Sequence, residues 1–152
     1  MSRPTADVRV LDVAARPTAV VPATTSWPEL PALWPVLLGE VWTCLRAEGI
    51  TSGCPNVMLY LDDTPRVEVG AELTRPCPLT GRVVGSTLPS GRVARAVHQG
   101  PYAALADTHD TVLVWCEARG LRVAGPRWEV YGPHRDDPAR LTTEVSWLLA
   151  TG

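Results

Sequence analysis

The hydrophobic and polar positions of the first third of the chain predict an extended segment followed by a helix. Residues 8–25 alternate apolar and polar side chains as a strand does, with a predicted kink at Arg16. Residues 26–48 place apolar side chains three and four positions apart, which is typical of a helix that packs on one face. Two prolines interrupt its first turns, so we expect the regular helix to run from near Trp34 to a stop at Gly49.

The remaining two thirds of the chain continue with strands and one more helix. Alternation and turn residues predict strands at 56–61, 66–73, 83–88, 91–99, 127–132 and 141–149. A second amphipathic helix is expected over residues 101–120, again ending at a glycine. Each half of the chain therefore has the order strand, helix, strand, strand.

Two pairs of residues indicate that these halves are a duplication. Gly49 and Gly120, which end the predicted helices, are 71 residues apart. Tyr60 and Tyr131, each late in the strand that follows, have the same separation. A constant offset between equivalent positions is typical of an internal repeat.

The repeat predicts the fold class and the place of a ligand. We expect one α+β domain over residues 1–152, made of duplicated βαββ units at about 5–74 and 82–150, with pseudo-two-fold symmetry and antiparallel sheets. The helices should lie on one side, with a ligand groove between the halves. Superposing the repeats places Met58 at the position of Glu129, so both are expected to face the groove.

The strand at 127–131 carries the most informative candidate. Side chains of a strand alternate between faces, so Glu129 shares a face with Tyr131, and Trp128 shares the other with Val130. If Glu129 faces the groove, Trp128 should face the helix layer. A carboxylate among apolar side chains is costly to keep charged unless it accepts hydrogen bonds, which the hydroxyls of Tyr131 and Tyr60 are able to donate.

Two uses of Glu129 remain open. As a charged group among aromatic rings it would attract flat cationic ligands, and as a general base it would activate a trapped water. The predicted ligand-binding residues are Glu129, Tyr131, Tyr60, Met58, Trp34, Tyr102 and Trp147. Glu129 and Tyr131 would be the catalytic residues if the protein is an enzyme.

The histidines and cysteines do not predict a metal or a cofactor. His98 is expected to order the turn into the second helix, and His109 to be a satisfied core histidine. His134, with Asp136 and Asp137, has the pattern of a solvated turn. The spacing of the four cysteines fits no zinc site, so we expect buried free thiols.

The second half resembles a known family through the segments HQGPY, WCEARG and WEVY, followed by a Pro-Asp turn. It is similar to GyrI-like small-molecule-binding domains, which are also the effector-binding domains of multidrug-responsive regulators. The resemblance implies that residues 98–102 form the entry to the second helix, and that Glu129 faces a central cavity with Tyr131. The first half matches by element order only.

Charge and composition narrow the partners. The net charge of −2 offers no basic field to nucleic acid, and no apolar run is long enough to span a membrane. We expect a cytoplasmic protein, a monomer or homodimer, without direct nucleic-acid contact and with a regulator as a possible partner.

The resemblance implies three alternative functions. The first is binding of hydrophobic, aromatic or cationic small molecules such as drugs or natural products, for sequestration or resistance. The second is hydrolysis of strained cyclopropane rings in DNA-alkylating natural products, or a related isomerase or cyclase, with Glu129 as general base. A protein-interaction module ranks last, because nothing indicates an acidic surface directed at gyrase.

Overall fold

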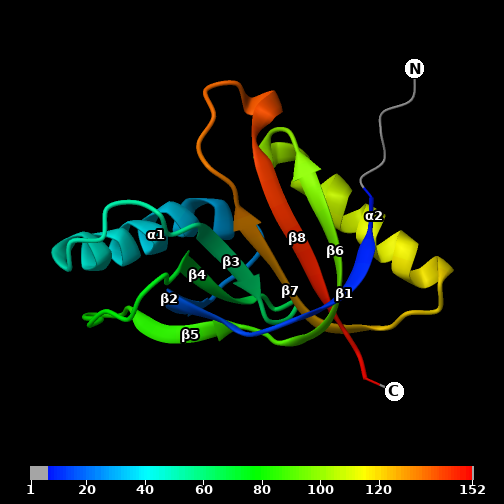
Figure 1. Ribbon diagram of the computed structural model, residues 1–152, viewed down its shortest axis with the longest axis horizontal. Helices are drawn as coiled ribbons and strands as arrows, with labels where there is room; N and C mark the ends of the chain where they lie inside the picture. The colour runs from blue at the N-terminus through cyan, green and yellow to red at the C-terminus, as the bar shows by residue number, and fades with distance from the viewer. Residues whose placement is uncertain (1–6, 152) are drawn as a thin grey trace.

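The computed structural model describes residues 7–151 as one antiparallel sheet of eight strands with two α-helices (Figure 1). The predicted start of the first repeat near residue 5 lies outside the described residues. The elements are β1 (Arg9–Val13), β2 (Arg16–Thr24), α1 (Leu30–Ala47), β3 (Asn56–Tyr60), β4 (Arg66–Glu72), β5 (Val84–Leu88), β6 (Gly91–Gln99), α2 (Leu105–Ala118), β7 (Val123–Tyr131) and β8 (Thr142–Leu149), with short 3-10 turns at Tyr102–Ala104 and Pro138–Arg140.

The strand order confirms the predicted α+β duplication. The order across the sheet is β1-β6-β8-β7-β3-β4-β2-β5, so β2-α1-β3-β4 and β6-α2-β7-β8 form two similar halves. Pairing of β3 with β7 joins the halves into one continuous sheet, where separate sheets were expected. Met58 lies directly opposite Glu129 in this pairing, so both side chains are on the same face, as the repeat predicted.

Each half also contributes one strand to the edge of the other half. β1 precedes β2 in the sequence, yet it pairs with β6 in the second half. β5 precedes β6, yet it pairs with β2 in the first half. The predicted kink is where β1 ends at Val13 and β2 begins at Arg16, which allows one extended segment to join both ends of the sheet.

The first helix begins earlier than its prolines suggested. α1 starts at Leu30 rather than near Trp34, with Pro31 in the first turn, where backbone N–H groups have no partner inside the helix. Pro35 lies inside α1 and cannot donate a hydrogen bond to the carbonyl of Pro31. The 18-residue helix α1 therefore tolerates the loss of one backbone hydrogen bond in its N-terminal part.

Both helices end in the same way, which strengthens the repeat. Gly49 and Gly120 have positive φ angles of 80° and 68°, a conformation in which glycine has no steric penalty. After each glycine, the next N–H reaches back across the last turn: Ile50 N donates to Leu45 O, and Leu121 N to Cys116 O, both at 2.9 Å. This hydrogen-bond pattern is a Schellman motif.

Three hydrophobic cores divide between the two faces of the sheet. One lies under α1 and one under α2, and a third has no helix residue at all. Figure 1 shows the helices at opposite ends of the sheet, with no helix between them over the central strands. Trp128, 1% exposed, belongs to the third core on the helix-free face. The expectation that Trp128 faces the helix layer is therefore wrong, because the face that carries Glu129 is also the face that carries the helices.

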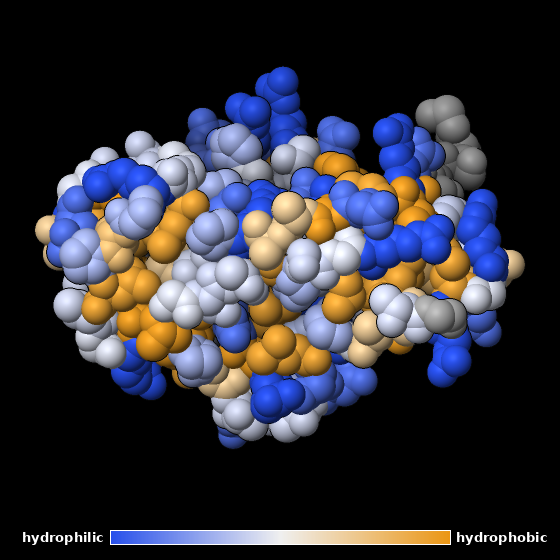
Figure 2. Space-filling view, turned by 60° about the horizontal axis from the view of Figure 1, so that its bottom comes forward, coloured by the Kyte–Doolittle hydropathy of each residue, from blue (hydrophilic) through white to orange (hydrophobic). Residues whose placement is uncertain are grey.

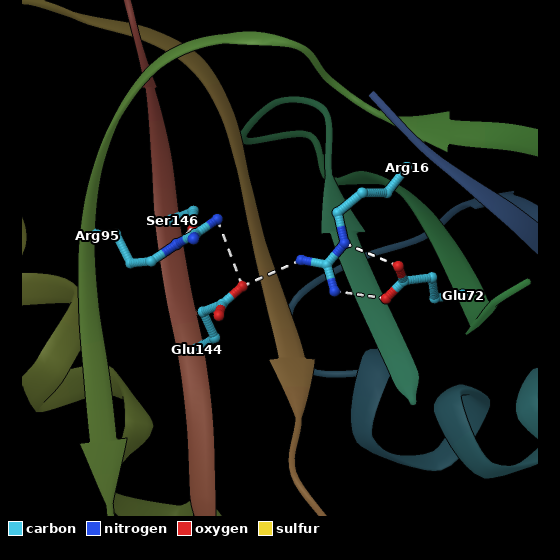
Figure 3. Close-up of polar contacts among 5 residues, drawn as sticks. All are labelled: Arg16, Glu72, Arg95, Glu144 and Ser146. Atoms are coloured by element: carbon cyan, nitrogen blue, oxygen red, sulfur yellow. Dashed lines mark hydrogen bonds and ion pairs between the residues drawn. The ribbon is translucent and has the colours of Figure 1, made fainter. Parts of the chain in front are cut away.

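An ion-pair network lies on the helix-free face (Figure 3). The guanidinium of Arg16 donates to both oxygens of Glu72, at 2.9 and 2.5 Å, and to Glu144 Oε1 at 3.2 Å. Arg95 contacts the same oxygen of Glu144 at 3.4 Å and donates to Ser146 at 2.9 Å. The hydrogen bond to Glu72 is the main cause of the raised pKa of Arg16. The network connects β2 and β4 of one half to β6 and β8 of the other.

The surface carries no large apolar face in the view of Figure 2, and the cysteines are unpaired. On the face in Figure 2, hydrophobic residues form several patches separated by hydrophilic ones. Within residues 7–151, no helix is long and apolar enough to cross a membrane. The four cysteines are free thiols; Cys44, Cys54 and Cys116 are buried, and Cys77 is half-buried, so its predicted burial is only partial.

Candidate ligand-binding groove

A groove of about 1460 Å³ lies between the two helices, over the central strands. This is more than a single drug-sized ligand usually fills. Its walls are rich in aromatic rings drawn from α1, α2, the strands and the loops around them. The aromatic side chains are Trp27, Trp34, Trp42, Tyr60, Tyr102, Tyr131 and Trp147.

The floor of the groove is built by β7 and its two neighbours. Arg127, Glu129 and Tyr131 alternate along β7 and therefore point to the same face. Register places Arg127 directly between Tyr60 on β3 and Trp147 on β8. A charged strand thus runs along the floor with aromatic rings beside it.

Glu129 is a buried carboxylate held by neutral donors. It is 4% exposed. Its Oε1 accepts hydrogen bonds from the hydroxyls of Tyr131 at 2.5 Å and Tyr60 at 3.4 Å, and its Oε2 accepts one from His109 Nε2 at 2.7 Å. Hydrogen bonds of this kind offset the cost of burying a charged group.

Trp147 determines the protonation pattern of His109. The indole Nε1–H of Trp147 can only donate, and it lies 2.9 Å from His109 Nδ1. Nδ1 must therefore accept, which leaves the ring hydrogen on Nε2, the atom facing Glu129. This arrangement makes His109 a neutral donor, and the chain Trp147–His109–Glu129 connects β8, α2 and β7.

The two tyrosines stay protonated in this environment. Burial raises the pKa of Tyr60 and of Tyr131, and the nearby charge of Glu129 raises both further. Both hydroxyls therefore remain donors well above neutral pH, and the carboxylate keeps its hydrogen bonds.

The structure brings most of the predicted site residues together. Those that line the groove are Trp34, Tyr60, Tyr102, Glu129, Tyr131 and Trp147. Met58 does not: it is 1% exposed and packs in the core under α1. Its side chain has the predicted direction, but the helix covers it, so its assignment as a ligand contact is corrected. That the six others contact a ligand stays a prediction.

Sequence reasoning missed many of the residues that line the groove, and three of them, Arg127, His109 and Trp27, contact its charged or aromatic floor residues. Arg127 precedes Glu129 by two positions, so strand alternation alone was sufficient to place it on the same face. His109 lies on the predicted inner face of the second helix and was interpreted as core, whereas it lines the groove. Trp27 precedes α1 in a loop, and no periodic signal identifies it.

The other histidines have structural surroundings. His98 Nδ1 lies 2.7 Å from Thr108 Oγ1, and its Nε2 lies 3.0 Å from Pro101 O, which confirms that it orders the turn into α2. His134 is largely exposed beside Asp136. Among residues 7–151, no group of three or more His, Cys, Asp or Glu side chains is arranged to hold a metal.

Comparison with known proteins assigns the family. The model of the GyrI-like small molecule binding domain matches residues 6–150, and the chain belongs to this family. No curated protein matches the chain.

Solved structures share the fold at low sequence identity. The C-terminal domain of EcmrR is 18% identical, with a TM-score of 0.77 over 97% of this chain and 99% of that one. SAV2435, in a structure with bound tetraphenylphosphonium, is 14% identical, with a TM-score of 0.65 over 95% and 94%. A Listeria innocua protein described as a hydrolase is 13% identical, with a TM-score of 0.62 over 97% and 93%.

Proposed function

We propose that this protein binds hydrophobic, aromatic small molecules, cations among them, in the groove between α1 and α2, with Glu129 as the polar anchor on the floor. The observation that carries this proposal is the way in which Glu129 is satisfied. Its three hydrogen-bond donors are neutral, so its charge is held in place without being neutralised.

The surroundings of Glu129 favour a cationic guest. Among residues 7–151, no arginine forms an ion pair with this carboxylate. The one basic side chain that contacts it is His109, which is neutral in this arrangement. Aromatic faces attract cations through their quadrupole, most strongly where water is excluded. An aromatic cation lying between the aromatic walls would therefore gain attraction from both the carboxylate and the rings.

Drug sequestration or resistance is the biological role that this binding would serve, in the cytoplasm and alone or with a partner regulator. The bound tetraphenylphosphonium of SAV2435 is an aromatic cation, which agrees with the proposal. The low identity between the two chains restricts that comparison to the fold.

The test is binding of a cation and a neutral analogue to matched variants. Tetraphenylphosphonium is the cationic probe and triphenylphosphine oxide the neutral one, each followed by quenching of Trp fluorescence. We expect micromolar affinity for the cation. Glu129→Gln should weaken cation binding about 5- to 150-fold, corresponding to roughly 1 to 3 kcal/mol for one charge contact, and change binding of the neutral probe much less.

The matched control is Glu117→Gln, which removes the same charge from an exposed position on α2 outside the groove. It should leave both affinities unchanged. Equal weakening of both probes by Glu129→Gln would show that Glu129 does not contact the ligand charge.

A hydrolase is the second candidate, and one feature of Glu129 favours it. A carboxylate oxygen has two lone pairs, and only one of those on Oε2 is used, by His109. The free lone pair would accept a proton from a water that attacks a ring carbon of a cyclopropane-bearing alkylator, while the opening C–C bond passes its electrons to the conjugated carbonyl of the drug. Tyr131 would orient the carboxylate.

Mass spectrometry of the incubated alkylator separates binding from turnover. A hydrolase should add one water to the drug, and Glu129→Gln should abolish this product while retaining most of the affinity. Recovery of the bound drug unchanged after many hours would reject hydrolysis for this substrate class and leave sequestration as the function.

A further inference from the structure

The second charged group on the groove floor, Arg127, has an unusual set of partners. It is 7% exposed and lines the groove two residues before Glu129. Its guanidinium carbon lies 5.0 Å from the ring centre of Trp147, 5.5 Å from that of Tyr60 and 5.7 Å from that of Trp27. Three aromatic rings therefore surround a buried cation.

The counter-ion of Arg127 is an exposed carboxylate that contacts it through a single oxygen. Nη2 donates to Asp63 Oδ1 at 2.6 Å, and Nη1 donates to the backbone oxygen of Gly125 at 3.2 Å. Arginine offers five N–H donors and usually takes a carboxylate through two parallel hydrogen bonds, but Asp63 uses only one of its oxygens. The side chain of Asp63 is 88% exposed, on the turn between β3 and β4.

The neighbouring Asp62 shows what a fixed carboxylate on the same turn looks like. It accepts from the side chain and backbone of Arg66 and from the backbone of Thr64, and the Arg66 hydrogen bond is the main cause of its lowered pKa. Among residues 7–151, the carboxylate of Asp63 has Arg127 as its one hydrogen-bond partner, while the backbone oxygen of Asp63 accepts from Trp27 Nε1 at 3.2 Å. This carboxylate is a solvated counter-ion at the rim, which a better-placed anion is able to replace.

The spacing along β7 defines what such an anion would belong to. Alternate residues of a strand lie on the same face with their Cα atoms about 6.6 Å apart, so Arg127 and Glu129 present opposite charges at successive inward positions of β7. We propose that the groove accepts amphoteric aromatic compounds, whose carboxylate displaces Asp63 from Arg127 and whose cationic part lies toward Glu129. Arg127 is then the specificity-determining residue. This inference rests on the proposed binding function and specifies its ligand class.

The experiment uses two dyes that differ by one charge. Rhodamine 110 carries a free carboxylate on a cationic ring system, and rhodamine 123 is its methyl ester. Their binding to the full chain is followed by fluorescence anisotropy. Arg127→Gln should weaken rhodamine 110 at least tenfold while leaving rhodamine 123 unchanged or bound more tightly, because the repulsion between Arg127 and the dye cation is removed.

Asp63→Asn provides the opposite change from an exposed turn position, so the test does not depend on whether Arg127→Gln folds. It should strengthen rhodamine 110 several-fold by removing the competing counter-ion, and leave rhodamine 123 nearly unaffected. Asp110→Asn, which removes the same charge from an exposed groove position on α2, is the matched control and should show no such selectivity.

The possible failures are distinguishable. If neither dye nor tetraphenylphosphonium binds, the proposed function itself fails. If both dyes bind but Arg127→Gln weakens them equally, or Asp63→Asn does not favour rhodamine 110, then Arg127 has only a structural role and the amphoteric class is overturned.

Discussion

The two faces of the sheet both contain carboxylates, and they satisfy them in opposite ways. On the helix-free face, Glu72 and Glu144 are paired with arginines, so the charges cancel within the protein. On the helix face, the donors that Glu129 receives from the described part of the chain are all neutral O–H and N–H groups. Ion pairing makes the first set a device for holding strands together, whereas neutral donors leave the second with a charge that a guest is able to use.

Two tryptophans also differ between the two faces of the sheet. Trp128 and Trp147 lie on neighbouring strands but on opposite faces. Trp128 is enclosed by aliphatic side chains of the third core, and Trp147 forms part of the groove wall. Trp128 is closed in on all sides, whereas Trp147 belongs to the core under α2 and also borders the groove, which gives three ways to test the comparison.

The largest effect should come from removing the large side chain of Trp128 from the core on the helix-free face. Trp128→Ala leaves a cavity among side chains that cannot collapse fully, and should lower the free energy of unfolding by about 3 to 5 kcal/mol in a urea titration. Trp147→Ala should cost less, because its ring already borders an open groove. The comparison breaks if the two substitutions are equally destabilising.

An intermediate loss of stability should appear at high pH, where the tyrosines that line the groove ionise in the unfolded chain. The pKa values of Tyr60 and Tyr131 are raised in the folded protein, so both states are protonated below pH 10 and stability there is independent of these groups. Above pH 10 the unfolded tyrosines ionise first, and stability falls as pH rises. At pH 11 the loss should reach up to about 1.4 kcal/mol for each tyrosine.

Urea titrations between pH 9 and pH 11.5 measure this loss, with Tyr131→Phe as the control. That substitution removes one of the two buried hydroxyls and should reduce the dependence by about half. If stability falls with pH as steeply in Tyr131→Phe as in the unsubstituted protein, other groups cause the effect.

The smallest effect should come from the ion pairs. Arg16→Gln removes the guanidinium shared by Glu72 and Glu144, and should cost about 1 kcal/mol at low salt and less at high salt, since partly exposed pairs are screened. Arg66→Gln, which breaks the more exposed pair with Asp62, is the matched control and should cost less still. Ligand affinity should be unchanged by Arg66→Gln, and a loss of affinity in Arg16→Gln would mean that the network reaches the site through Glu144, which also borders the groove.

The repeat was predictable because its signals are local. Helix stops at Gly49 and Gly120, and the alternation that pairs Glu129 with Tyr131, depend on a few neighbouring residues only. The exchange of β1 and β5 between the halves was not predictable in this way, because strand partners far apart in the sequence leave no local pattern. The same is true of the continuity of the sheet across β3 and β7.

The site shows the same division between local and distant information. Symmetry gave Met58 its correct direction but not the helix that covers it. Alternation placed Trp128 correctly opposite Glu129, and the error was to expect α1 and α2 on the face of Trp128. The contact of Trp147 with His109, and of His109 with Glu129, depends on three elements meeting in space. Arg127 is different, because strand alternation alone is enough to place it on the same face as Glu129.

The exchanged strands also determine how a guest enters. Because β1 is paired with β6 and β5 with β2, the two halves are tied at both outer edges of the sheet as well as through β3 and β7 in the middle. Such a connection resists hinge motion between the halves, so we expect the backbone of the groove to stay rigid when a ligand binds. Different guests would then be accommodated by turning rings and by rim residues such as Trp27 and Asp63, while the backbone beneath them keeps its form.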